Sequence, residues 1–165
     1  MKDTPPATLR RLVGTRLTSI GRAADLECFE FQSPSAHTGI IALHVACPWR
    51  VTSSGRIVVG ANDYWRPAVT GSPYDDAFEK GVIGSRLVDV GNAVVRQVIA
   101  HDRLAVLTAT ADHLGGFRIE LSEGYAIEGF PDSAHADHDE SEFWRLFEPE
   151  GPHLVISSDG LDYVT

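Results

Sequence analysis

The chain has 165 residues, 43% of them hydrophobic, and a formal net charge of −9 at pH 7. This acidic balance argues against a nucleic-acid partner and an anionic membrane surface, because both need clustered Lys and Arg. No apolar run approaches the roughly 20 residues that span a bilayer, and the first residues lack the apolar stretch of a secretory signal. The composition predicts a cytoplasmic globular protein, with Cys28 and Cys47 as buried reduced thiols.

The first part of the chain predicts a short helix followed by a hairpin. Thr4 and Pro5 suit an N-cap and a first helical position, and Gly14 suits the end of a helix over residues 5–13. Residues 16–31 alternate as a hairpin that turns at "GRAAD". Its second strand offers these candidates for the core: Leu26, Cys28, Phe29 and Phe31.

Two further strands are predicted next. Residues 40–51, "IIALHVACPWRV", are typical of one long strand, in which Pro48 indicates a bulge or an edge position. A turn at "TSSG" then leads to a returning strand, "RIVVGAND".

The middle of the chain is less regular. Residues 71–81 predict a short helix, with Ser72 before Pro73 as its cap and Gly81 at its end, and "SRLVDVGN" predicts another. Residues 93–111 predict a second hairpin that turns at "AHDR", because Val and Ile are β-branched and favour strands.

The last part of the chain predicts more strands. "GFRIELSEGYAIEGF" is typical of a third hairpin with its turn at "SEG". An acidic loop, "PDSAHADHDESE", leads to a strand, "FWRLF", and to a final strand in "HLVISSDG".

A Trp-Arg pair occurs twice, and the surrounding patterns match. When Trp49-Arg50 is placed on Trp144-Arg145, a turn with glycine follows in both copies. Val58-Val59 then matches Leu154-Val155, and Asp63 matches Asp159. The repetition predicts a tandem duplication, in which two small halves bury their apolar sheet faces against each other.

The expected fold class is α+β, mostly antiparallel β with a few short helices, in a pseudo-duplicated single domain over residues 1–165. Its half-repeats cover residues 4–66 and 85–162, and residues 67–84 connect them.

The candidate site residues begin with the two Trp-Arg pairs. Neighbouring residues of a strand point to opposite faces, so Trp49 and Trp144 are expected in the core and Arg50 and Arg145 outside it. In this interpretation each arginine pairs with an acid across the turn, Asp63 or Asp159. In a second interpretation, the pairs line a groove between the halves and hold an anionic or planar ligand.

A second candidate is "NDYWRP", which places Asp63, Tyr64, Trp65 and Arg66 at the end of a strand. Tyr, Trp and Arg are enriched at the energetic centres of protein interfaces. The simpler interpretation is a strand end that packs its aromatics on a helix. A binding patch is sought here first.

Motifs for catalysis, metal binding or nucleotide binding are not evident. The loop from His135 to Glu140, "HADHDE", carries metal-ligand types, but its spacing matches no tight metal motif, so a flexible acidic loop is expected and no metal site is predicted. Neither a nucleophile elbow nor a phosphate-binding glycine loop is present. Asp63 and Asp159 form a pair of catalytic carboxylates only if a two-fold axis brings them together.

One resemblance rests on "EFWRLFEPEGPHLVISSDG", preceded by "FRIELSEGYAIEGFPDS". This part, roughly residues 85–160, resembles small bacterial proteins with a Glu-x-Trp-Arg strand motif. Some of those proteins sit beside genes for secreted toxins and are suspected immunity proteins. The resemblance implies a protein partner, and it carries no catalytic residue over.

We therefore expect a non-enzymatic, cytoplasmic binding module without a cofactor, which presents an acidic, aromatic-containing surface to another protein. An immunity-type inhibitor fits this charge, because a basic toxin is drawn to an acidic surface. The alternative is a small-molecule-binding protein whose ligand lies between the halves, against Trp49, Arg50, Trp144 and Arg145. A third hypothesis is an enzyme that uses Asp63 and Asp159. The sequence does not indicate an oligomeric state.

Overall fold

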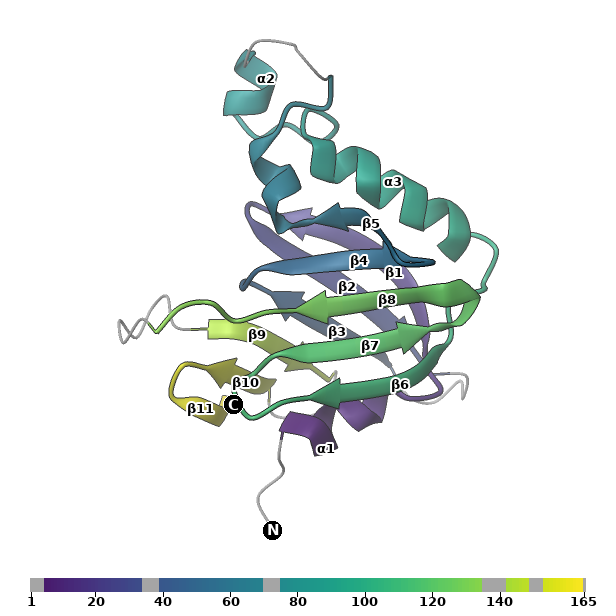
Figure 1. The fold of residues 1–165 in the computed structure, drawn as a ribbon, viewed down its shortest axis with the longest axis vertical. Helices are drawn as coiled ribbons and strands as arrows, with labels where there is room; N and C mark the ends of the chain where they lie inside the picture. The colour runs from purple at the N-terminus through teal and green to yellow at the C-terminus, as the bar shows by residue number, and fades with distance from the viewer. Residues whose placement is uncertain (1–4, 34–38, 70–74, 135–141, 149–152, 165) are drawn as a thin grey trace.

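Eleven strands form two antiparallel sheets in the computed structural model, which describes residues 5–33, 39–69, 75–134, 142–148 and 153–164. This arrangement, with a few short helices, confirms the predicted α+β class (Figure 1). None of the helices in the described part of the chain is long and apolar enough to cross a membrane.

The first sheet has six strands in the order β1-β2-β3-β9-β10-β11. Their bounds are β1 Arg16–Ala23, β2 Leu26–Gln32, β3 Ile40–Val45, β9 Glu142–Phe147, β10 His153–Ser157 and β11 Gly160–Val164. The second sheet has five strands in the order β5-β4-β8-β7-β6. Their bounds are β4 Trp49–Ser53, β5 Arg56–Gly60, β6 Val106–Ala111, β7 Phe117–Leu121 and β8 Tyr125–Gly129.

The helices lie at the margins of the two sheets. They are α1 Pro5–Leu9, η1 Arg10–Leu12, η2 Ala61–Trp65, α2 Asp76–Glu79, α3 Leu87–Ile99 and η3 Ser122–Gly124. Figure 1 shows α3 along the margin where β5 and β1 lie, and α1 below β6. The predicted first helix is confirmed as α1 and η1, and Gly14 follows it with a φ of +83°, which glycine adopts without strain.

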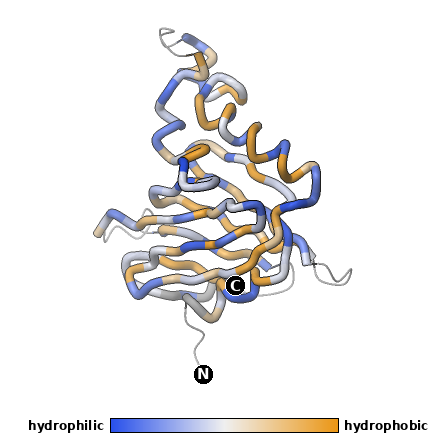
Figure 2. The backbone as a smooth tube through the Cα atoms, turned by 45° about the vertical axis from the view of Figure 1, so that its right-hand side comes forward, coloured by the Kyte–Doolittle hydropathy of each residue, from blue (hydrophilic) through white to orange (hydrophobic). Residues whose placement is uncertain are grey.

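The two sheets face each other across one core. The inward residues of both sheets are buried, and four of them have no exposed surface: Phe29, Leu43, Ile119 and Trp144. Apolar and polar residues alternate along the strands (Figure 2), as expected when only one face of each sheet is buried. The sheets join at one corner, where the Leu17 amide donates to the Leu104 carbonyl at 2.9 Å.

The strand order makes the two halves topologically equivalent. The first half gives the meander β1-β2-β3 to one sheet and the hairpin β4-β5 to the other. The second half gives β6-β7-β8 to that other sheet and β9-β10 to the first. Both meanders also shift register at the same place, after Leu17 and after Val106. The duplication stays a prediction, and this exchange of hairpins supports it.

The tryptophans occupy equivalent places in this arrangement. Trp49 lies opposite Gly129, the last residue of β8, and Trp144 lies opposite Val45, the last residue of β3. Pairs further along the hairpins correct the sequence alignment by one residue. Val51 pairs with Val59, and Leu146 pairs with Leu154. The counterpart of Leu154 is therefore Val59, and not Val58 as the sequence alignment had it.

The predicted strand over residues 93–100 is wrong, because these residues belong to helix α3. Val88, Asn92 and Val95 recur at helical spacing and are fully buried. This amphipathic period outweighs the strand preference of the β-branched side chains.

Two other strand predictions need correction. The single strand predicted over residues 40–51 is two strands, β3 and β4, and the chain leaves one sheet for the other at Ala46 to Pro48. In β2 the inward residues are Glu27, Phe29 and Phe31, so Leu26 and Cys28 are only half-buried. Both cysteines are free. The last strand, β11, was not predicted, and the Ser72 cap lies outside the described residues.

Candidate functional site

The two tryptophans are core residues, as predicted. Trp49 is 4% exposed and meets Phe29 edge to face at 5.7 Å. Trp144 is fully buried and meets Phe117 in the same way at 5.7 Å. The two indole nitrogens have different surroundings. The Trp144 nitrogen donates to the Gly115 carbonyl at 2.7 Å, whereas the Trp49 nitrogen has no acceptor among the described residues.

The two arginines point outward, but their predicted acid partners are wrong. Arg50 pairs with Glu128 on the neighbouring strand β8, with Nε 2.5 Å from Oε2. Arg145 pairs with Glu142 on its own strand. Asp63 instead accepts the Gly60 amide at 2.9 Å and so holds the start of η2.

The four Trp-Arg residues do not share a cleft. Arg50 lies on the outer face of one sheet and Arg145 on the outer face of the other, with both tryptophans in the core between them. The two aspartates do not converge either. Asp63 belongs to η2, which follows the edge strand β5 of one sheet, whereas Asp159 lies in the turn between β10 and β11 of the other sheet.

A groove of about 510 Å³ does unite five of the predicted residues. It lies where the chain crosses from β3 to β4, beside η2 and the end of β8. The five are Trp49, Arg50, Asp63, Tyr64 and Trp65. Of the other predicted residues, Arg66 is exposed next to this groove in the chain, and Trp144, Arg145 and Asp159 lie elsewhere.

Exposed aromatic rings form the rim of this groove. Trp65 is 59% exposed and Phe130 is 42% exposed. The guanidinium of Arg50 lies over Phe130 at 4.7 Å, and that of Arg86 lies over Trp65 at 5.9 Å. Arg86 also pairs with Asp25, another lining residue, at 3.3 Å. The rim therefore combines large apolar surfaces with charged groups that hold them in place.

Beneath the groove lies a buried carboxyl group that the sequence did not predict to face the core. Glu27 is fully buried on β2. The Tyr64 hydroxyl donates to its Oε2 at 2.5 Å, and the Asn92 amide donates to its Oε1 at 2.9 Å. Burial raises the pKa of Glu27 to about 8, although both hydrogen bonds and the nearby Arg96 and Arg22 act in the opposite direction.

A buried ion pair adjoins this carboxyl. Arg22 and Asp89 have side chains 4% and 5% exposed, with Nε 2.9 Å from Oδ1. Burial opposes the charge of Asp89, but hydrogen bonds from Arg22 and from the Gly84 and Arg86 amides lower its pKa. The Arg22 guanidinium also lies over the Tyr64 ring at 5.8 Å. Together these contacts, which we call the polar network, join β1 and β2 to η2 and α3.

The polar network breaks the equivalence of the halves. In one sheet, Glu27 stands opposite Val45, which stands opposite Trp144. In the other sheet the equivalent row is Phe117, Gly129 and Trp49. The ring of Phe117 lies over Gly129, where a Cβ atom would collide with it. Where one half has an apolar contact, the equivalent position in the other half therefore has a buried carboxyl group.

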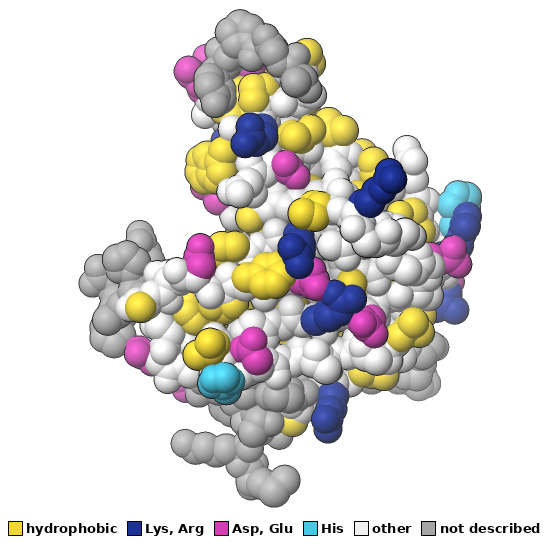
Figure 3. Space-filling view, viewed as in Figure 1, with side chains coloured by type: hydrophobic (Ala, Val, Ile, Leu, Met, Phe, Trp, Pro, Cys, Tyr) yellow, Lys and Arg dark blue, Asp and Glu magenta, His cyan; other side chains and the backbone are white. Residues whose placement is uncertain are grey.

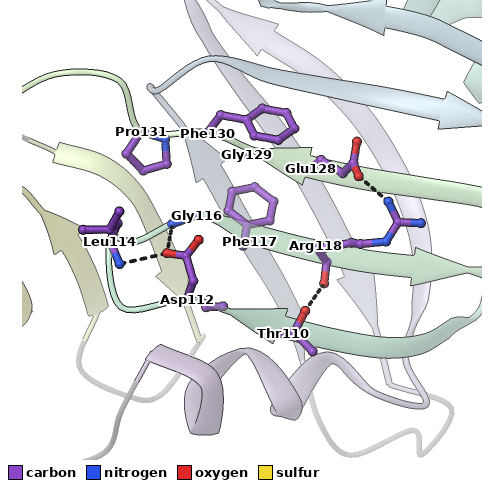
Figure 4. Close-up of a pocket in the computed structure, with 11 residues that line it drawn as sticks. Thr110, Asp112, Leu114, Gly116, Phe117, Arg118, Glu128, Gly129, Phe130 and Pro131 are labelled. Atoms are coloured by element: carbon purple, nitrogen blue, oxygen red, sulfur yellow. Dashed lines mark hydrogen bonds and ion pairs between the residues drawn. The ribbon is translucent and has the colours of Figure 1, made fainter.

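The outer face of the five-stranded sheet holds a second hollow of about 390 Å³, which shares Phe130 with the groove (Figure 4). Phe130 and Pro131 line one side of it, and the ion pair between Arg118 and Glu128 lines another. Since Arg50 and Arg118 pair with Glu128, and Arg118 also pairs with Glu120, two positive and two negative charges balance on this face. The aromatic groove beside the polar network is therefore the stronger candidate.

The loop from His135 to Glu140 lies outside the described residues. Among the residues that the structure does describe, no group of three or more His, Cys, Asp or Glu side chains could hold a metal ion. Comparison of the chain with known protein families, curated proteins and solved structures found no match in any of the three.

Proposed function

We propose that the protein is a non-enzymatic binding module that contacts a protein partner through the aromatic groove. The observation that carries the proposal is Trp65, which is 59% exposed on the groove rim. Tryptophan is prominent among the residues that dominate binding energy at protein interfaces, where it fills a desolvated contact. Arg86 stacks on the ring and η2 holds the backbone, so little side-chain entropy is left to lose on binding.

The partner in this proposal is a protein with a basic surface. A net charge of −9 accelerates the approach of such a partner, and the acids Asp25 and Asp63 lie in the groove wall. The resemblance of the C-terminal half to suspected immunity proteins adds one concrete version, in which the partner is a toxin. A small molecule is the second candidate, since a volume of about 510 Å³ lies within the usual range of ligand pockets.

The test is capture of partners by the immobilised protein and by two variants. Trp65→Ala removes the rim tryptophan, and Leu114→Ala truncates a leucine of similar exposure outside the groove. We expect the first to weaken binding of the captured partner by about 30-fold, which corresponds to ~2 kcal/mol. The second should bind as the wild type does. Equal binding by both variants would show that the groove is not the contact.

A further inference from the structure

Tyr64 connects the groove to a buried carboxyl group. Its side chain lines the groove, and its hydroxyl donates to Oε2 of Glu27 at 2.5 Å. The next residue of η2 is Trp65, which lies on the groove rim. Figure 3 shows hydrophobic side chains on both sides of this hollow, toward η2 and toward the end of β8. A movement of η2 that frees Tyr64 therefore changes the groove and uncovers Glu27 at the same time.

Glu27 has hydrogen-bond donors but no cation bound to it. Its two oxygens accept from Tyr64 and from Asn92, and it forms no ion pair within the described residues. A fully buried carboxylate without a bound cation is costly, because two donors replace only part of its hydration. The neutral form avoids this cost and has a place for its proton. The Oδ1 atom of Asn92 is buried without a donor among the described residues, so a turned amide can accept from the carboxyl group.

The cations near Glu27 bond to other groups. Arg22 of β1 pairs with Asp89 of α3, and Arg96 of α3 donates to the Ile20 carbonyl. Burial raises the pKa of Glu27 to about 8, because it outweighs the two hydrogen bonds and the attraction of these arginines. The titratable and charged groups that face Glu27 are thus Arg22, Tyr64 and Arg96, with Cys28 on its own strand, whereas β3 places the apolar Val45 opposite it.

We propose that loss of the proton from Glu27 loosens η2 and so opens the wall of the groove. In the open form water reaches the carboxylate and restores the hydration that burial removes. The carboxyl group therefore has a lower pKa in the open form than in the closed form. The proton's contribution to the closed form is fully present below the lower of these pKa values and is lost as the pH rises through about 8. The effect on binding rests on the proposed function, but the opening does not.

The test is native-state hydrogen exchange of the η2 amides at several pH values from about 5 to 9, with each rate divided by the intrinsic rate to give an opening constant. In the wild type this constant should exceed that of the core strands β7 and β8. It should also rise by up to about tenfold per pH unit until about pH 8. In Glu27→Gln it should not change with pH. Glu30→Gln, on the same strand, is the control and should behave as the wild type.

Two results in the wild type would overturn the proposal. If the η2 amides exchange only as slowly as those of β7 and β8, then Glu27 is uncovered only when the whole molecule unfolds. If the η2 opening constant does not change with pH, the proton has no hold on η2. An equal rise in Glu27→Gln would overturn it as well, because another group would then be responsible. Circular dichroism confirms that each variant is folded.

A second variant tests the part played by Tyr64. Tyr64→Phe keeps the ring but removes a donor that lowers the pKa of Glu27, so the rise in the opening constant should continue beyond about pH 8. A plateau at the wild-type pH would contradict this link between Glu27 and η2.

Capture of the partner separates this proposal from the proposed function. The captured partner should bind the wild type more weakly at about pH 8.5 than at about pH 6.5, and this difference should be much smaller for Glu27→Gln. If the difference is the same in both proteins while the exchange result holds, the groove is not the contact, and the proposed function fails without the opening.

Discussion

Replacement of Glu27 by glutamine should change how the stability of the protein depends on pH. The side chain is fully buried, and its carboxyl group accepts hydrogen bonds from Tyr64 and Asn92. Glutamine has nearly the same shape and cannot ionise. The buried Oδ1 of Asn92 has no donor among the described residues, so it can accept from the new amide.

The sign follows from the direction of the pKa shift. Burial raises the pKa of Glu27 to about 8 in the folded protein, whereas a glutamate in an unfolded chain has a pKa of about 4.3. The folded state therefore holds the proton more tightly. Its contribution to stability is fully present below about pH 4.3 and is lost as the pH rises through about 8. The slope reaches ~1.4 kcal/mol per pH unit, and the whole change is about 5 kcal/mol.

The assay is urea unfolding, followed by tryptophan fluorescence at several pH values from about 5 to 9. The free energy of unfolding of the wild type minus that of Glu27→Gln should fall steadily up to about pH 8 and then level off. Subtraction removes the other titrating groups, which both proteins share. Glu30→Gln, on the same strand, is the control and should run parallel to the wild type. Parallel curves for Glu27→Gln as well would refute the reasoning.

Two matched pairs of variants test the packing in the core between the two sheets, by the same unfolding measurement. Trp144→Phe loses an indole hydrogen bond that Trp49→Phe does not lose, so the first should cost about 1–2 kcal/mol more; equal losses would contradict this. Gly129→Ala places a methyl group in the Phe117 ring and should cost about 3 kcal/mol or more. Gly21→Ala, where the new methyl group meets nothing within 4 Å, should cost much less, and similar losses would count against the packing.

Much of the fold could be predicted because its strands follow simple periodicity. The hairpins β1-β2 and β7-β8 alternate clearly and end at turn residues, and both are confirmed. The repeated Trp-Arg pair identified two strands in equivalent positions. Trp49 and Trp144 mark the place at which each hairpin enters the opposite sheet, and such a large side chain is needed there to fill the space between the sheets.

Other features depend on tertiary contacts that a single sequence does not display. The alternation in "LECFEF" fits a strand with either of its two faces turned inward. In the structure the inward face is the one that carries Glu27. That choice is stable only because Tyr64 and Asn92 supply donors from distant parts of the chain. The same holds for α3, whose valines favour a strand until Asp89 and Asn92 find partners on one side. Asp63 and Asp159 matched in letters but not in place, because the alignment assumed one extra residue in the second turn, whereas the pairs Val51–Val59 and Leu146–Leu154 have equal spacing.

The polar network does more than add stability. A buried ion pair and carboxyl rarely stabilise a fold more than an apolar pair of similar volume, and the equivalent place in the other half shows such an apolar solution in Phe117 over Gly129. What the network adds is orientation. Tyr64 fixes η2 and so the adjacent Trp65, while Asp89 and Asn92 fix α3 against β1 and β2. One buried cluster, with members from both halves of the chain, thus positions both the wall of the groove and α3.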